Sequence, residues 1–444
     1  MKPTAGATWA LFILFAINAL NFFDRQILGA VAEPIRREFN LSDGALGALT
    51  TAFTLLYAAA GVPLGRWADR GRRTTILAVG VFLWSLLTAA SGLARSFWQL
   101  FSLRLAVGVG EACCAPAATS LIGDLVPPNR RGRALSTFML GLPVGVAASY
   151  AASGVIARNY GWRYAFYLAL VPGLLCAVAA LWIGEPQRGA TESHDVGTRA
   201  RGNSAYLQVL SIPTMWWLIL SGALHNFSMY ALASFLTPFL MRFHGADIQT
   251  ANFISMVVFG LSGLPGLILG GIVADAAAGR RTGSRLAVGA LALFASAPLS
   301  FFALGRSRGD SLVFALLMGL ACVLMYAYYS TVYPTIQDVI EPARRGTAMA
   351  LYFFGMYVLG ASFGPLGTGL ASDYFTAQAA RAAGVVASTP QALEPFRAGG
   401  LHSAMYVIPV LCLLLAVVLF AASRTAPRDI EKLQAWMRDS GPRT

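Results

Sequence analysis

The sequence predicts an all-α membrane protein in which 12 transmembrane helices form two six-helix bundles, and three observations support this prediction. First, 57% of the 444 residues are apolar and 12% are charged, whereas soluble proteins carry about 25% charged residues. Second, apolar stretches long enough to cross a bilayer as helices recur along the chain, without the alternation typical of strands. Third, the two halves of the chain repeat the same short motifs. This hydrophobicity excludes a disordered chain. Nucleic-acid binding is not expected, because the basic residues form short clusters between uncharged stretches.

The apolar stretches can be counted directly. Nine contain no Asp, Glu, Lys, Arg or His: 44–65, 74–94, 134–157, 164–184, 248–274, 286–305, 311–337, 346–372 and 403–423. Three more contain a charge or a histidine: 9–31, 97–123 and 213–241. We expect the first of these to be an uncleaved membrane helix rather than a signal peptide, because its helical pattern continues past the length of a signal peptide.

The distribution of basic residues predicts the topology. With the N-terminus in the cytoplasm, 21 of the 33 Lys and Arg residues lie in cytoplasmic segments and 10 lie in outer loops. Cytoplasmic loops of membrane proteins are enriched in Lys and Arg. We therefore expect both termini to be cytoplasmic, in a multi-pass protein of the inner or plasma membrane. The net charge of +13 mainly reflects this topology and suits an anionic inner leaflet.

No enzyme chemistry is indicated. The five cysteines lie in apolar stretches and have no spacing that fits a zinc site. We expect no metal, no other cofactor and no catalytic residues. No nucleotide-binding motif is present, so ATP is not expected to be the energy source.

A polar, Gly/Ser/Thr-rich interruption at 185–212 separates six predicted helices from the other six. It predicts an N-terminal bundle at 1–184, a cytoplasmic linker at 185–212, a C-terminal bundle at 213–422 and a cytoplasmic tail at 423–444. Duplicated six-helix halves are typical of transporters that work by alternating access.

The repeat is clearest after the second and eighth predicted helices. Gly65-Arg66-Trp67-Ala68-Asp69 is followed by Gly71-Arg72-Arg73, and Gly271-Ile272-Val273-Ala274-Asp275 is followed by Gly279-Arg280-Arg281. An Asp at a helix end can pair with an Arg or cap the next helix. Positive-inside topology alone would explain the arginines but not the Gly-xxx-Asp spacing. We therefore expect a cytoplasmic gate. Its candidate residues are Gly65, Asp69, Arg70, Arg72, Arg73, Asp275, Arg280 and Arg281.

Four charges lie inside predicted spans: Asp24, Arg25, Arg104 and Glu111. Each costs roughly 2.5–3.5 kcal/mol at bilayer depth, so such residues usually face a cavity or a partner. Helical rise places Asp24 and Glu111 at similar depth. A carboxylate beside an arginine at that depth can act as a proton switch. The alternative is a permanently charged structural clamp.

The chain resembles the major facilitator superfamily. The two repeated loops are similar to its Gly-xxx-Asp-Arg-x-Gly-Arg-Arg motif, although the first copy is one residue short after Arg70 and the second has Ala276 where Arg is usual. Within the superfamily, three stretches resemble the Spinster-type lipid transporters: Asn21-Phe22-Phe23-Asp24-Arg25, the run from Arg104 to Ala112, and Leu142-Pro143-Val144-Gly145. Sugar-acid and organic-anion symporters have similar motifs. The Spinster resemblance implies that the four charges both gate the transporter and couple it to protons.

The superfamily pattern implies a central cavity lined by the first, fourth, seventh and tenth helices. The polar and aromatic residues that we expect to line it are Asn18, Asn21, Phe22, Asn226, Tyr230, Tyr326 and Tyr329. One charged wall and one aromatic wall suit an amphipathic substrate. A location at the membrane–water interface, or ordinary packing, would also account for the tyrosines. We expect His225 to be a packed helix residue.

The sequence leaves three functional hypotheses. The first is a secondary, proton-coupled transporter for an amphipathic lipid such as a lysolipid or sphingoid. The second is a proton-coupled symporter of organic anions or sugar acids that uses the same arginines. The third is a passive lipid scramblase or a non-transporting sensor. The expected partners are the substrate, protons and membrane lipids, and we expect the chain to act as a monomer.

Overall fold

The computed structural model describes residues 5–68, 71–187, 204–279, 283–341, 344–385 and 389–440. Within these ranges the chain is helical and contains no strand. Twelve of its helical stretches are long and apolar enough to cross a membrane, which confirms the expected fold class. They are Gly6–Ala30, Asp43–Gly61, Arg73–Ser91, Phe97–Leu125, Arg133–Tyr160, Trp162–Leu181, Pro213–Arg242, Ile248–Ala278, Ser284–Leu304, Ser311–Asp338, Arg345–Ala382 and Pro390–Trp436.

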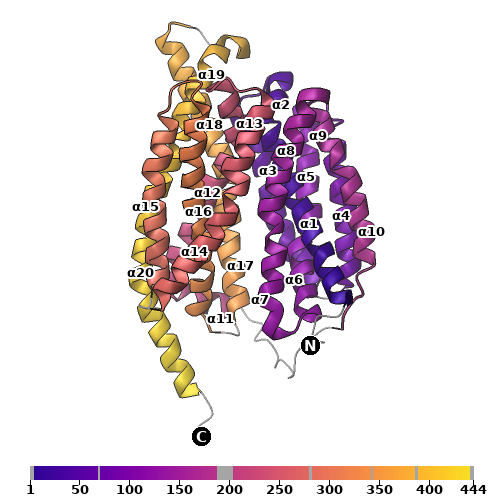
Figure 1. The fold of residues 1–444 in the computed structure, drawn as a ribbon, viewed down its shortest axis with the longest axis vertical. Coiled ribbons are helices and arrows are strands. Elements are labelled where there is room, and N and C mark those ends of the chain that lie inside the picture. The colour runs from indigo at the N-terminus through magenta and orange to yellow at the C-terminus, as the bar shows by residue number, and fades with distance from the viewer. Residues whose placement is uncertain are drawn as a thin grey trace. The chain divides into compact units, whose positions relative to one another are not determined.

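Several of these stretches consist of two or three shorter helical elements (Figure 1). The first half of the chain contains α1 (Ala5–Ala30), α2 (Ala32–Phe39), α3 (Asp43–Ala68), α4 (Arg73–Ser91), α5 (Phe97–Glu111), α6 (Cys114–Leu125), α7 (Pro128–Met139), α8 (Gly141–Tyr160), α9 (Trp162–Leu168) and α10 (Leu170–Leu181). The second half contains α11 (Ser204–Leu210), α12 (Pro213–Arg242), α13 (Ile248–Ser255), α14 (Gly263–Ala278), α15 (Ser284–Leu304), α16 (Ser311–Asp338), α17 (Arg345–Gly355), α18 (Phe363–Ala382), α19 (Pro390–Met405) and α20 (Val407–Ser440). Two π-helices, η1 (Met256–Leu261) and η3 (Met356–Ala361), interrupt the eighth and eleventh spans.

Local sequence signals account for several helix ends. The Ser96 side chain accepts a hydrogen bond from the Gln99 N–H at the start of α5, as N-cap residues do. The short helix α2 ends at Asn40, which has φ 52°, a left-handed conformation that asparagine tolerates better than most residues. This turn leads the chain from α2 into α3.

Contacts group the chain into two compact units. Unit 1 comprises residues 1–195, 233–261 and 365–401. Unit 2 comprises residues 196–232, 262–364 and 402–444. Unit 1 therefore joins segments of both sequence halves, and α12 contributes to both units. The division into bundles at residues 184 and 213 stays a prediction.

Glycines permit the closest helix packing in unit 1. A Cβ on Gly145 of α8 would lie 2.0 Å from the carbonyl oxygen of Ala19 in α1, and a Cβ on Gly47 of α3 would lie 2.3 Å from that of Pro365. Small residues allow membrane helices to approach in this way. This packing brings α1 close to α8 and holds it in the interior of the unit, where it carries the functional residues.

Candidate functional site

The centre of the candidate site is an ion pair between α1 and α5. The Nε atom of Arg25 lies 2.7 Å from the Oε2 atom of Glu111, and the two side chains are 9% and 0% exposed. The Asn21 amide, one turn before Arg25, donates to the same oxygen at 2.9 Å. Asn21 and Arg25 share a helix face because they are four residues apart. The predicted meeting of α1 with the helix of Glu111 is therefore observed.

Aromatic rings surround the two guanidinium groups. The Arg25 guanidinium carbon lies 4.2 Å from the ring centroid of Tyr57, 5.2 Å from that of Phe22 and 5.3 Å from that of Phe53. The corresponding carbon of Arg104 lies 4.9 Å from the Phe53 centroid. Cations are attracted to the faces of aromatic rings, most strongly away from water. Phe53 thus lies within contact distance of both guanidinium groups.

Asp24 and Arg104 are buried beside this ion pair without hydrogen bonds of normal geometry. Both oxygens of Asp24, the Nε and Nη1 atoms of Arg104, and the second oxygen of Glu111 have no hydrogen-bond partner among the described residues. Asp24 is subject to the charges of Glu111 and Arg104 and to the donors of Trp84 and Thr88 on α4. Arg25 therefore pairs with Glu111 and not with its sequence neighbour Asp24.

The remaining α1 candidate serves a packing contact. The Asn18 amide donates to the carbonyl oxygen of Phe138 in α7 at 2.7 Å. A buried amide of this kind holds two helices together, because leaving either group without a partner in the apolar interior costs free energy. Asn18 lies on the predicted face of α1 but has this partner of its own.

The other predicted cavity residues lie in unit 2, where α12 and α16 bring them together. The Tyr329 hydroxyl donates to the Asn226 side-chain oxygen at 3.3 Å, and the rings of Tyr326 and Tyr329 are 6.2 Å apart. Tyr230 lies edge-to-face with Tyr357 of η3 at 6.4 Å. Asn226, Tyr230, Tyr326 and Tyr329 thus belong to one aromatic cluster.

His225 is a packed residue of the same cluster. Its ring stacks on that of Tyr328 at 4.0 Å and meets Tyr329 edge-on at 4.9 Å. The Tyr328 hydroxyl is hydrogen-bonded to those of Ser221 at 2.8 Å and Tyr352 at 2.9 Å. This cluster is a buried, hydrogen-bonded group of aromatic rings within unit 2.

The predicted gate in the first half centres on Arg73, which is fully buried. It forms ion pairs with Asp124 at the end of α6 and with Glu185 at 2.8 Å. Arg72 is exposed. A Cβ added to Gly65 would lie 3.9 Å from the ring of Pro116 on α6. Arg73 therefore ties the start of α4 to the ends of the fourth and sixth spans.

Glu185 also caps α4. Its Oε2 atom accepts from the Thr74 N–H at 3.0 Å and from the Thr74 hydroxyl at 2.9 Å. Burial raises the pKa of Glu185, but these hydrogen bonds and the Arg73 charge lower it below its usual range. Glu185 is thus held as an anion at the positive end of the helix dipole.

The second copy of the motif forms a related ion cluster within unit 2. Arg285 lies 3.0 Å from Asp275 and 2.6 Å from Asp338. Arg285 at the start of α15 has the role that Arg73 has at the start of α4, and Asp338 at the end of α16 corresponds to Asp124. Asp69, Arg70, Arg280 and Arg281 lie outside the described residues.

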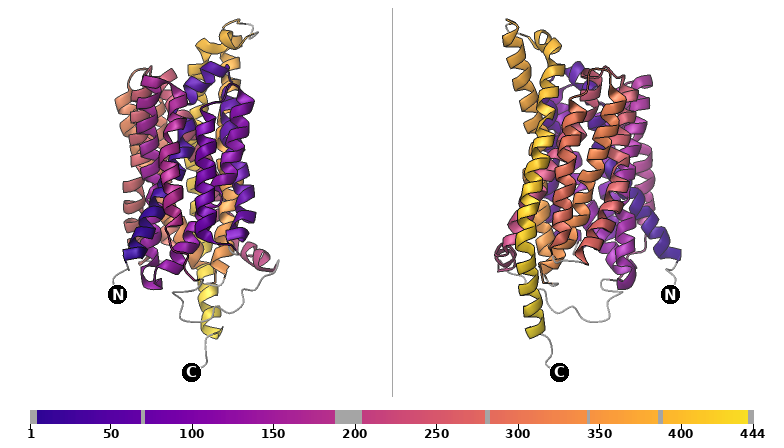
Figure 2. Two further views of the ribbon diagram at one scale, coloured as in Figure 1. Left: turned by 90° about the vertical axis from the view of Figure 1, so that its right-hand side faces the viewer. Right: turned by 60° about the vertical axis from the view of Figure 1, so that its left-hand side comes forward.

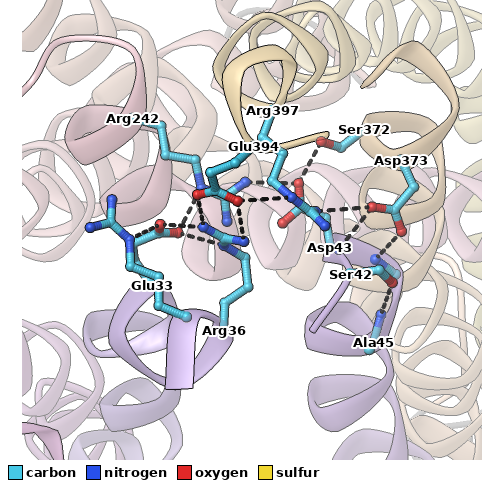
Figure 3. Close-up of polar contacts among 12 residues, drawn as sticks. Glu33, Arg36, Ser42, Asp43, Ala45, Arg242, Ser372, Asp373, Glu394 and Arg397 are labelled. Carbon is cyan, nitrogen blue, oxygen red and sulfur yellow. Dashed lines mark hydrogen bonds and ion pairs between the residues drawn. The ribbon is translucent and has the colours of Figure 1, made fainter. Parts of the chain in front are cut away.

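A larger ion cluster in unit 1, which the sequence did not lead us to expect, surrounds Glu33 and Asp43 (Figure 3). We call it the Glu33 cluster: Glu33, Arg36, Asp43, Arg242, Ser372, Asp373, Glu394 and Arg397. The Arg242 guanidinium contacts Glu33 at 2.6 Å and Asp43 at 2.8 Å. Arg36 contacts both Glu33 and Glu394. The cluster therefore joins α2 and α3 to the end of α12 and to α19.

A second part of the cluster caps α3. The carboxylate of Asp373 on α18 accepts from the backbone N–H groups of Asp43 at 2.9 Å and Gly44 at 2.8 Å. The Ser372 hydroxyl donates to the Asp43 side chain at 2.6 Å. Helix N-termini bind anions because their first N–H groups lack partners in the helix. Asp373 thus attaches α18 to α3.

The arginines of the Glu33 cluster hold Glu33 ionised. Glu33 is completely buried, which raises its pKa, but Arg242 and Arg36 lower that pKa to about 2. The same interactions raise the pKa of Arg36 despite its own burial. The signal available in the sequence was the charged segment Glu33-Pro34-Ile35-Arg36-Arg37, whose partners are about 200 or more residues away and cannot be assigned from spacing.

Comparison with known proteins identifies the family to which this fold and these motifs belong. The family model described as Major Facilitator Superfamily matches residues 14–365. The chain belongs to the major facilitator superfamily. Within it, the chain is 30% identical to "Protein spinster homolog 1" of Mus musculus, over 83% of this chain and 73% of that protein. It is 29% identical to an "MFS-type efflux pump" of Mycolicibacterium smegmatis, over 83% of this chain and 85% of the pump.

The structural similarity is to the same group. A crystal structure of a bacterial homolog to the human lysosomal transporter Spinster, described as inward-facing and unoccupied, matches with a TM-score of 0.86. The identity is 28%, and the match covers 96% of this chain and 98% of the other. The chain is therefore a Spinster-type member of the major facilitator superfamily and a multi-pass integral membrane protein. Its family and fold are those of transporters.

Proposed function

We propose that this protein is a secondary active transporter that works by alternating access, couples to protons and moves an amphipathic lipid such as a lysolipid or sphingoid. The observation that carries the proposal is the group of four buried charges on α1 and α5, in which Arg25 and Glu111 form an ion pair while Asp24 and Arg104 lack hydrogen bonds of normal geometry. The distribution of basic residues supports a cytoplasmic location for both termini.

The arrangement supports switching rather than a fixed clamp. Buried charges are stable when each is paired and hydrogen-bonded, and leaving one without a partner is strongly unfavourable. Asp24 and the Nε and Nη1 atoms of Arg104 do not meet that condition among the described residues. Protonation of a carboxylate would remove its unpaired charge, and binding of an anionic group at Arg104 would give that guanidinium a hydrogen-bond partner. Proton binding and substrate binding are thereby linked through the same four side chains.

The surroundings of the arginines support an amphipathic substrate. Rings of Phe22, Phe53 and Tyr57 pack on the Arg25 guanidinium, so an anionic headgroup and an apolar chain can be bound side by side. The similarity to a Spinster homolog supports a lipid, and that to an efflux pump supports export. The organic-anion hypothesis would use the same arginines with a small, fully polar substrate.

Substitution by lysine tests the headgroup role of the arginines. Arginine binds phosphate or carboxylate through two parallel hydrogen bonds, which lysine cannot reproduce. We expect Arg104→Lys and Arg25→Lys to weaken binding of a lysolipid about 10-fold or more, although the charge is kept. The measurement is equilibrium binding to the purified protein at one pH. Normal binding by both variants would refute the headgroup role and leave the clamp.

A scan of candidate substrates separates the hypotheses. Thermal stabilisation of the purified protein by lysophospholipids or phosphorylated sphingoids, but not by sugar acids or dicarboxylates, supports the lipid proposal. The reverse pattern would favour the organic-anion symporter. Movement of a fluorescent lipid through proteoliposomes with no dependence on a pH gradient would indicate a passive scramblase instead.

A further inference from the structure

A hollow in unit 2, formed by segments that contain none of the four buried charges, has the features of a lipid site. It has a volume of about 380 Å³ and lies where α11, the end of α16 and the last turns of α20 meet. Its apolar lining includes Val209, Ile212, Leu433 and Trp436, and its cations are Arg344 and Lys432. Figure 2 shows α20 extending past α11 at this end of the unit. The hollow thus combines an apolar wall with two positive charges.

The carboxylates that line the hollow have partners of their own. Asp429 accepts from the Thr214 N–H at 3.1 Å and from the Thr214 hydroxyl at 2.6 Å, which caps the start of α12. Glu341 is paired with Arg344. Lys432 is exposed, and its ammonium group is open to a ligand. The lining thus holds two cations and two carboxylates, and among the described residues Lys432 is the lining cation without a carboxylate partner.

Basic residues continue along the same helix. Arg424, Arg428 and Lys432 are all exposed and recur every four residues on α20, whereas Ala426 and Asp429 are buried against the unit. Residues four apart lie on one helix face. The three cations form a stripe that runs from the membrane-spanning part of α20 to the hollow.

The hollow lies where two of the membrane spans end, which is where lipid headgroups are expected. It is lined by Pro213, the first residue of one span, and by Val339, which directly follows the last residue of another. Trp436 lines it and is 52% exposed, and the exposed Trp216 donates to the carbonyl oxygen of Leu210 in the adjoining turn. Exposed tryptophans are typical of the membrane–water interface, and basic pockets between helices on the cytoplasmic side bind acidic headgroups.

We propose that this hollow binds the headgroup of an anionic phospholipid, with the phosphate at Arg344 and Lys432 and an acyl chain along Leu433 and Trp436. The apolar wall favours a lipid over free phosphate, which would leave that wall unused. The site shares no residue with the four buried charges and does not depend on the proposed function. Because Asp429 on the same helix caps α12, the bound lipid would also hold the C-terminal helix in place.

Native mass spectrometry of the purified full-length protein, with added phosphatidylglycerol or phosphatidylcholine of equal chain length, tests the proposal. We expect tighter retention of phosphatidylglycerol. The double variant Arg344→Gln/Lys432→Gln should reduce its affinity about 30-fold, since each cation near a membrane surface contributes about 1 kcal/mol. The matched control is Arg95→Gln, an exposed cation just before α5, which should retain the lipid as the unaltered protein does.

A second variant separates loss of lipid binding from loss of folding. Lys432→Glu changes one exposed residue and should weaken phosphatidylglycerol binding more than Lys432→Gln. Equal affinity for the two lipids, or an unchanged affinity in the double variant, would overturn the proposal. Displacement of phosphatidylglycerol by millimolar inorganic phosphate would assign the site to free phosphate and would also overturn it.

Discussion

At the scale of single residues, the distinctive feature is an incomplete pairing of buried charges. Arg25 and Glu111 satisfy each other, and Asn21 adds a hydrogen bond to the same carboxylate oxygen. Asp24 and Arg104 lie close to this pair, and among the described residues neither Asp24 oxygen nor the Nε and Nη1 atoms of Arg104 have a hydrogen-bond partner. Buried charges without hydrogen-bond partners are unfavourable, and in the proposed mechanism a proton or the substrate supplies those partners.

Glu111→Gln tests the coupling. The amide keeps the size of the side chain but cannot bind and release a proton, so we expect substrate movement to lose its dependence on a pH gradient. The variant should still fold, with a lower melting temperature because Arg25 loses its buried partner. The measurement is transport into or out of proteoliposomes at two imposed pH gradients. Glu38→Gln is a suitable control, because Glu38 is a half-exposed partner of Arg163. Full pH dependence in the Glu111 variant would refute the coupling role.

At the scale of the elements, glycines decide how closely the helices approach. Gly145 lies in the Leu142-Pro143-Val144-Gly145 stretch of α8, where a Cβ would meet the Ala19 carbonyl at 2.0 Å. The backbone of α1 would have to move to admit one methyl group. The Asn21 and Arg25 side chains, which depend on that backbone, would then be displaced from Glu111.

We therefore expect Gly145→Ala to lower stability by about 1–3 kcal/mol, the usual cost of overpacking. The matched control is Gly61→Ala on α3, where an added Cβ meets no atom within 4 Å. There the change should be neutral or stabilising by about 0.5–1 kcal/mol, because alanine favours the helix. Thermal unfolding of both variants in one detergent measures the difference, and equal melting temperatures would contradict it.

The two π-helices are a further feature of the elements that the apolar runs did not reveal. η1 and η3 interrupt the eighth and eleventh spans, and each is followed by a serine, Ser262 or Ser362. The N–H of Ser362 donates to the Tyr357 carbonyl, five residues back, at 3.0 Å. Single π-turns of this kind occur frequently at functional sites. Hydropathy predicts that such a segment spans the membrane. It does not predict whether each N–H donates to the carbonyl four or five residues back.

At the scale of the whole molecule, unit 1 is held together at one end by the Glu33 cluster. Its charges come from α2, α3, α12, α18 and α19, so residues more than 300 positions apart share one network. Arg242 connects two buried acids, Glu33 and Asp43. Removing one partner from a buried pair typically costs about 3–5 kcal/mol, because the other charge stays buried without compensation.

Arg242→Gln should therefore destabilise this end of unit 1 by about 3–5 kcal/mol. We expect a lower melting temperature and faster modification of a cysteine placed at Ser372. Arg158→Gln is the control, because Arg158 is exposed and bonds Gln249 at the surface, where substitutions change stability by about 0.5 kcal/mol or less. If both variants behaved alike, the cluster would not hold this end together.

The same cluster predicts a pH dependence of stability. The pKa of Glu33 is about 2 in the folded protein against 4.5 as its ordinary value, a difference worth roughly 3 kcal/mol. A lowered pKa contributes stability above the ordinary value and loses it as the pH falls toward the folded value. The melting temperature of the unaltered protein should exceed that of Glu33→Gln by a constant amount above about pH 5, and the gap should narrow as the pH falls below about 4.5. A gap that stays constant down to about pH 3 would contradict this.

Features that are encoded locally could be predicted from the chain alone. The lengths of the apolar runs predicted all 12 spans, because a helix satisfies its own backbone in lipid and needs about 20 apolar residues to cross it. The rarity of charge inside those runs singled out Asp24, Arg25, Arg104 and Glu111. The repeated Gly-xxx-Asp loops indicated the family. Such a motif can be recognised from the sequence because all its residues lie within a few positions of one another.

Which of these charges pair with one another became known from the folded structure. Arg25 pairs with Glu111 and not with Asp24, Arg73 reaches Asp124 and Glu185, and Arg242 reaches Glu33 and Asp43. Each cation has several acids within plausible reach along the sequence. The choice depends on how glycine contacts and side-chain packing rotate and space the helices. Two charges pair when folding places their helices side by side. Their separation along the sequence does not give that distance in space.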